Sequence, residues 1–133
     1  MARMTIGRLA VAAGAHVTTV RFYERTGLLP PPARSAGGHR IYGEDHLQRL
    51  IFIRHAREFD FSIDAIKELL VMSDASRTSC RDVHVLATAH LRAVRGRIAD
   101  LTRLETRLAD ALAQCAREAS STCSLLRLLG RAA

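Results

Sequence analysis

The feature that most constrains this chain is a run of about 34 residues, 81–114, that contains no proline and only one glycine. Its apolar residues recur at spacings of three and four, the period of one face of an α-helix. They are Leu91, Val94, Ile98, Leu101, Leu104, Leu108 and Leu112. A helix of this length spans roughly 50 Å. A chain of 133 residues is too small to cover the stripe, so we expect the helix to pair with a second copy of itself.

The segment before this helix has the pattern of two short helices joined by a turn. Thr5 is a typical N-cap for a helix over residues 6–13, and Gly14 is expected to end that helix. A second helix is predicted over residues 17–25, with Gly27 just past its end. This arrangement is typical of a helix-turn-helix, whose second helix enters the DNA major groove.

The next segment, residues 28–42, favours a small two-stranded wing. Its three prolines exclude a regular helix, and Gly37-Gly38 favours a tight turn between two extended runs. The polar residues that this wing would carry are Arg34, His39, Arg40 and Tyr42. Apolar spacing then predicts helices over residues 44–57 and 63–71, followed by a polar linker over 73–79.

The distribution of charge favours a polyanionic partner for the first part of the chain. The net charge is +7, and residues 1–42 carry six arginines against one glutamate. In residues 80–133 nine arginines alternate with five acidic residues, as on a solvated helix face. A basic cluster on a helix-turn-helix with a wing predicts binding to double-stranded DNA.

The second helix supplies the side chains expected to face DNA. Hydroxyl and guanidinium groups are the ones that reach base edges and phosphates. On this helix they are Thr18, Thr19, Arg21, Tyr23 and Arg25. We expect Val17, Val20 and Phe22 to hold the helix to its scaffold. A solvated basic helix in an unrelated bundle is the alternative, and the wing and the charge cluster weigh against it.

The three cysteines favour a metal site once the long helix is considered. Each alone could be a small buried hydrophobe, but metal–thiolate bonds of about 2.3 Å require the ligands to converge on one point. Cys115 and Cys123 can meet across a short loop, whereas Cys80 lies at the other end of the helix. In an antiparallel pair, Cys80 of one protomer would meet the partner's Cys115 and Cys123, so a dimer would hold two sites.

Several motifs in the first part of the chain resemble the MerR family of transcription regulators. They lie at residues 5–7, 13–14, 19–29 (TVRFYERTGLL), 40–42 (RIY) and 61–66 (FSIDAI). The resemblance is dense over residues 4–72 and looser along the long helix. It implies that Thr19 and Arg21 face the major groove, and that Arg54 adds a further DNA contact. The residues that it implies for phosphate contacts are Tyr23, Arg40 and Tyr42.

The resemblance also bears on the metal. Metal sensors of this family bind their ion at the dimer interface, with one cysteine at the start of the long helix and two in a C-terminal loop. Sensors of monovalent ions usually have serine at the first position, where this chain has Cys80. Three thiolates suit Hg(II), Cd(II) or Pb(II). Zinc sensors often add a cysteine and a histidine, which residues 116–122 lack, so Zn(II) is less favoured.

Together these inferences predict a mostly α-helical fold with a winged helix-turn-helix head. A long antiparallel coiled-coil dimerisation helix and a short metal-binding loop follow. The expected parts are residues 1–74 for the DNA-binding head, 75–114 for the linker and dimerisation helix, and 115–133 for the loop and tail. No apolar run approaches about 20 residues and no signal peptide stands at the start, so we expect a cytoplasmic protein without membrane contact.

The predicted function is that of a homodimeric regulator that binds operator DNA and responds to a divalent heavy-metal ion. Metal binding would distort the operator so that RNA polymerase can use the promoter. An enzyme is not expected, because no nucleophile–base pair or acid pair stands out. A thiol-based redox regulator using Cys115 and Cys123 is the alternative. Redox members of the family carry four grouped cysteines, whereas only two are grouped here.

Overall fold

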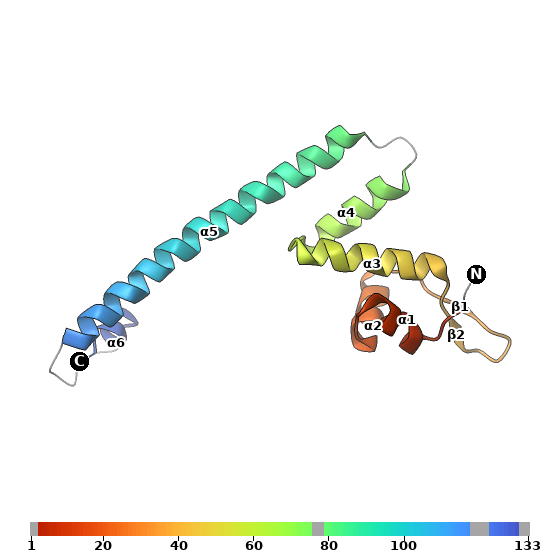
Figure 1. Cartoon of the computed structure of the whole chain (residues 1–133), viewed down its shortest axis with the longest axis horizontal. Coiled ribbons are helices and arrows are strands. Elements are labelled where there is room, and N and C mark those ends of the chain that lie inside the picture. The colour runs from red at the N-terminus through yellow and green to blue at the C-terminus, as the bar shows by residue number, and fades with distance from the viewer. Residues whose placement is uncertain (1–2, 76–78, 118–122, 131–133) are drawn as a thin grey trace. The chain divides into compact units, whose positions relative to one another are not determined.

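The computed structural model describes residues 3–75, 79–117 and 123–130, which fold as two compact units, Met1–Val83 and His84–Ala133. These residues form six helices and two short strands, whose order along the chain can be followed by colour in Figure 1. In chain order they are α1 (Ile6–Ala13), α2 (Val17–Thr26), β1 (Ala33–Arg34), β2 (Arg40–Ile41), α3 (Glu44–Glu58), α4 (Ile63–Asp74), α5 (Cys80–Arg117) and α6 (Ser124–Leu128). The predicted mostly helical fold with a two-stranded wing and one long helix is confirmed.

The first unit is built around α1, which packs against α2 and α3. The side-chain hydroxyl of Thr5 accepts a hydrogen bond from the Arg8 N–H at 3.3 Å and caps the start of α1, as predicted. Fully buried side chains of all four helices form the core. They include Leu9, Val20, Leu50, Ile53 and Ile66. Burying this apolar surface stabilises the head.

Gly14 ends α1 in the left-handed conformation, with φ of 69°. Arg54 of α3 approaches closely, because its Nη1 donates a hydrogen bond to the Ala13 carbonyl oxygen at 2.8 Å. A Cβ at position 14 would collide with the Arg54 guanidinium. The backbone conformation therefore favours glycine here, and a larger side chain would also displace the Arg54 guanidinium from the Ala13 carbonyl.

We expect Gly14→Ala to destabilise the protein by about 1–3 kcal/mol, because an L side chain is strained in the left-handed region and Arg54 must leave the Ala13 carbonyl. Gly7→Ala, within the same helix, is the matched control. Its Cβ would meet only the Thr5 hydroxyl at 4.0 Å, so stability should be unchanged or rise by about 0.5–1 kcal/mol. Urea unfolding followed by circular dichroism, at one protein concentration, measures both. Equal midpoints for the two variants would contradict this account.

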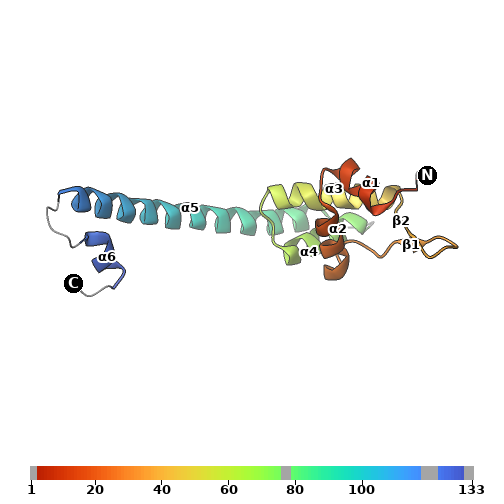
Figure 2. The same cartoon turned by 90° about the horizontal axis from the view of Figure 1, so that it is seen from below.

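The wing consists of β1 and β2, which pair antiparallel with Ala33 opposite Ile41 and Arg34 opposite Arg40. Figure 2 shows the two strands and their turn extending beyond the helices of the first unit. Gly38 occupies the turn with φ of 81°. Met4 and Tyr42 exchange two backbone hydrogen bonds, of 2.8 and 2.9 Å, which tie the start of the chain to the wing. The sequence patterns did not predict this bridge.

Two helices are longer than their apolar patterns indicated. Ser62 caps α4 as expected, but α4 continues to Asp74, whose carboxylate pairs with Arg49 of α3 at 3.1 Å. α5 has 38 residues rather than about 34 and begins at Cys80 itself. Ser79 supports this start, because its hydroxyl lies 3.4 Å from the Asp82 N–H. The predicted linker is correspondingly shorter.

The apolar stripe of α5 is uncovered in the single chain. Ala111 is the one buried residue along this helix, all of which the structure describes. The leucine and isoleucine side chains from Leu91 to Leu112 are between 45% and 62% exposed. Among the described residues, no helix is long and apolar enough to cross a membrane.

Helix α6 is a finding that the sequence patterns missed. It covers five residues directly after Cys123, and its Ser124 is buried. A helix of little more than one turn is too short to show an apolar period. It gives defined structure to part of what was predicted as a loop and tail.

Candidate DNA interface and metal centre

The second helix of the predicted helix-turn-helix presents one face to the core and one to solvent. Val20 and Tyr23 are buried. The side chains on the opposite face are exposed, namely Thr18, Arg21 and Arg25, and Thr19 is half-buried at its edge. Their exposure is what DNA contact requires, and the contact itself stays a prediction.

Phe22 does not have the role predicted for it, since it is 43% exposed. At 100° per residue, Val20 and Tyr23 share the inward face and Phe22 points away from it. Tyr23 supplies the aromatic anchor instead, and its ring centroid lies 5.7 Å from that of Phe22. The burial of Tyr23 leaves little of this side chain for the predicted phosphate contact.

Side chains organise the turn of the wing. Arg34 Nη1 donates to the Gly38 carbonyl oxygen at 2.9 Å, and the His39 N–H donates to the Ser35 hydroxyl at 3.2 Å. The Ser35 N–H donates to the His39 carbonyl oxygen at 2.8 Å and closes the turn. Arg34, His39 and Arg40 are all exposed. The wing therefore offers a basic surface held in a defined conformation.

Glu24 joins the wing to α2. Tyr42 is fully buried, and its hydroxyl donates to Glu24 Oε1. Arg40 Nη1 donates to Glu24 Oε2 at 2.9 Å. The pKa of Tyr42 is raised, by burial first and then by its hydrogen bond to Glu24. The pKa of Arg40 is raised by its interaction with Tyr42 and by the charge of Glu24, so the guanidinium stays charged.

This network bears on two predicted phosphate contacts. The Tyr42 hydroxyl is engaged inside the head, so touching a phosphate would require it to leave Glu24. Arg40 keeps further donors for DNA, because its side chain is 41% exposed and guanidinium has five N–H groups. The sequence patterns did not reveal a role for Glu24, although its being the one acidic residue among the first 42 is a signal that could have found it.

Arg54 links two helices. Besides its hydrogen bond to the Ala13 carbonyl, its Nε lies 3.9 Å from the Glu58 carboxylate. The guanidinium of Arg54 thus holds the end of α1. Half of the Arg54 side chain is exposed, and its contact with DNA stays a prediction.

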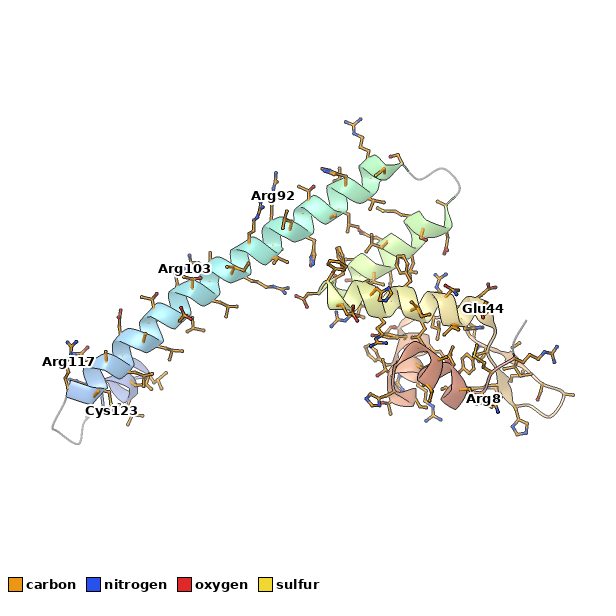
Figure 3. The ribbon with its side chains drawn as sticks, in the orientation of Figure 1. Arg8, Glu44, Arg92, Arg103, Arg117 and Cys123 are labelled. Carbon is orange, nitrogen blue, oxygen red and sulfur yellow. The ribbon has the colours of Figure 1, made fainter. Side chains whose placement is uncertain are left out.

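The structure brings two of the three cysteines together. Cys115 lies in the last turn of α5 and Cys123 directly precedes α6, and their Sγ atoms are 2.9 Å apart. Both cysteine side chains are half-buried. Figure 3 shows Cys123 beside the end of α5. Cys80, the first residue of α5, is exposed and lies 35 positions before Cys115. Over that many helical residues the separation is about 52 Å.

The thiol pair fits part of a metal site. Two thiolates bound to one tetrahedral ion at about 2.3 Å lie about 3.8 Å apart, so the pair must open by about 1 Å. Among the described residues no three histidine, cysteine or acidic side chains come together to hold an ion. Glu118, for which the sequence favours a solvated loop residue over an oxygen ligand, lies outside the described residues. A complete three-thiolate site therefore needs a ligand from another chain.

Comparisons with known proteins agree with this architecture. Residues 4–72 match the family described as "MerR HTH family regulatory protein", and residues 47–111 match "MerR, DNA binding". The chain is 42% identical over 127 residues to a mercuric resistance operon regulatory protein from Serratia marcescens, covering 95% of this chain and 87% of that protein.

Two further relatives cover most of the chain. An HTH-type transcriptional regulator, a ZntR homolog from Haemophilus influenzae, is 42% identical over 80% of this chain and 79% of that protein. The crystal structure of the transcription regulator PbrR691 from Ralstonia metallidurans CH34 in complex with lead(II) superposes with a TM-score of 0.82. It is 44% identical and covers 96% of this chain and 99% of that one.

Proposed function

The chain belongs to the MerR family of helix-turn-helix regulatory proteins, and on that premise we propose that it is a homodimeric transcription regulator responding to a soft divalent heavy-metal ion. The observation that carries the proposal is the pair of half-buried thiols 2.9 Å apart at the end of a long helix. The third thiol stands at the start of that helix, where an antiparallel partner would present its own pair.

Dimerisation through α5 is supported by its exposed apolar stripe. Half-exposed leucines at helical spacing lose contact with water when two such helices pair, which stabilises the pair. An antiparallel pair closes with two-fold symmetry and places the start of one helix beside the end of the other. Cys80 would then lie next to the partner's Cys115 and Cys123.

Hg(II), Cd(II) and Pb(II) are favoured over Zn(II) as the inducing ion. Three thiolates make a soft donor set, and the relatives include a mercuric resistance regulator and a regulator crystallised with lead(II). Ion binding would favour one of two dimer geometries, and the head would transmit it to the operator as bending and untwisting. RNA polymerase would then engage the promoter elements.

The proposal assigns a task to each part of the chain. Residues 1–74 would bind DNA, 75–114 would link the head to the dimer and pair the two chains, and 115–133 would hold the ion. The compact units divide between Val83 and His84, within the first turns of α5. Motion at the metal site would therefore reach the head through the start of this helix.

A thiol-based redox regulator is the second candidate, and the short distance between the two thiols favours it. Oxidation of both thiols would form a disulfide, with two electrons passing to the oxidant. This candidate predicts that diamide or peroxide changes transcription in metal-free medium, where a metal sensor stays silent.

The function is tested with a reporter. Duplexes that the protein binds are first selected from random DNA and placed in a promoter, and expression is measured with Hg, Cd, Pb, Zn, Cu and Au salts. We expect induction by one or more of the first three ions.

Arg21→Ala, on the exposed face of α2, should weaken binding to the selected duplex by roughly 10-fold or more without changing the metal stoichiometry. Unchanged footprints, or no response to any ion, would contradict the proposal.

A further inference from the structure

We infer that Glu24 is a positioning residue that makes DNA recognition selective, because its carboxylate holds Arg40 of the wing in a fixed place relative to α2. The inference rests on the proposed DNA-binding function and deepens it. It concerns a residue that faces neither the base edges nor the predicted metal site.

The first support is geometric. Glu24 lies on α2, while its partners lie 16 and 18 residues later, in and beside β2. Each carboxylate oxygen has its own donor, Tyr42 at Oε1 and Arg40 at Oε2. The Glu24 side chain is only 11% exposed. One carboxylate therefore connects the helix expected to read bases with the strand expected to contact phosphates.

The second support is electrostatic. Glu24 is the single negative charge among the first 42 residues, which otherwise carry six arginines. A carboxylate beside a DNA-facing surface repels phosphates and lowers affinity for any duplex. Its two charge-assisted hydrogen bonds offset its burial, but they give the surface no extra attraction for DNA. What the carboxylate can supply is orientation.

The orientation of Arg40 decides how its charge is used. A free arginine side chain can follow a phosphate wherever it lies and adds affinity for every sequence alike. With Nη1 bound to Glu24, the guanidinium of Arg40 is held at one end, and its remaining N–H donors are presented from a defined position. Phosphate contacts set the register in which a recognition helix meets the base edges. A fixed Arg40 can bind its phosphate only in the register in which α2 also contacts the base edges, so it adds affinity for that register alone.

The test is Glu24→Gln, which keeps the shape but has one acceptor oxygen and a donating NH₂ group. Placed as the carboxylate is, its one oxygen faces Arg40 or Tyr42 and its NH₂ group faces the other, and the bond to Arg40 is no longer an ion pair. We expect its affinity for the selected duplex to fall while its affinity for a scrambled duplex stays or rises, so the ratio drops about tenfold. The freed Arg40 should also make the salt dependence on scrambled DNA steeper by about one phosphate contact.

Two further variants make the test decisive. Glu68→Gln, exposed on α4, removes the same charge outside the network and should leave the ratio unchanged. Tyr42→Phe keeps the charge of Glu24 and removes one of its two bonds, so it should lower the ratio without raising affinity for scrambled DNA. Urea midpoints for all variants show whether each is folded, and Tyr42→Phe carries the test if Glu24→Gln is not.

The outcomes separate this inference from the proposed function. If the two affinities fall in parallel in folded variants, or if the ratio equals that of the wild type, Glu24 has no positioning role and the inference is overturned. If the wild-type protein itself does not prefer the selected duplex, the proposed DNA-binding function fails and takes this inference with it.

Discussion

Replacing any one of Cys80, Cys115 and Cys123 by serine is expected to reduce metal-induced transcription to the uninduced level while operator binding persists. A serine hydroxyl is a hard, protonated group that does not replace a thiolate on a soft ion. Structural zinc sites of four cysteine or histidine ligands in zinc-finger peptides provide about 10–16 kcal/mol, so losing one ligand should weaken metal binding by about 100-fold or more. Operator binding persists because the head folds as part of the first compact unit.

The measurement pairs reporter induction with metal binding to the purified variants. Ala116→Ser is the matched control, because it adds a serine hydroxyl at an exposed position of the turn that holds Cys115. It should respond like the wild type. Normal induction in any of the three cysteine variants would exclude the three-thiolate site.

The same variants distinguish the metal sensor from the thiol switch. A switch formed by Cys115 and Cys123 needs no contribution from Cys80, which lies at the far end of α5. Cys80→Ser would then keep its response to diamide, while the other two variants would lose theirs. A metal sensor instead loses its response to the ion in all three.

Local signals in the sequence were sufficient to predict most of the fold. Thr5 as an N-cap and Gly14 and Gly27 as helix ends act within a few residues of themselves, and all three stand where predicted. The end of α4 was placed too early because Asp74 is held by Arg49, a residue 25 positions away. The prediction that Phe22 lies in the core was wrong. The burial of Val20 and Tyr23 fixes the rotation of α2 and turns Phe22 toward solvent, and composition alone does not reveal that rotation.

In the candidate site, too, contacts between residues close in sequence could be predicted, and contacts between distant residues could not. Seven residues separate Cys115 from Cys123, and this spacing predicted that the two thiols could meet. The Glu24 network depends on how the wing folds back onto α2, which no pattern within one helix contains. The role of Arg54 is similar, since its hydrogen bond to Ala13 joins residues 41 positions apart.

Mixing Cys80→Ser protomers with Cys115→Ser protomers is expected to restore metal binding that neither variant has alone. In the mixed dimer, the Cys115→Ser protomer contributes Cys80, and its partner contributes Cys115 and Cys123, so one of two sites is intact. Random pairing makes half of the dimers mixed, and an equal mixture should therefore bind about a quarter of the ions bound by wild type. A dimer purified through two different tags should bind one ion.

Mixing Cys115→Ser with Cys123→Ser is the control that tests which chain supplies each thiol. Because the Sγ atoms of Cys115 and Cys123 lie 2.9 Å apart within one chain, each protomer in this mixture carries a broken pair. No mixed dimer can then assemble a site, and no ion should bind. Rescue in this mixture would mean that the two loop cysteines come from different chains. Failure of the first mixture would mean that Cys80 does not cross the dimer, which the length of α5 requires if it is a ligand at all.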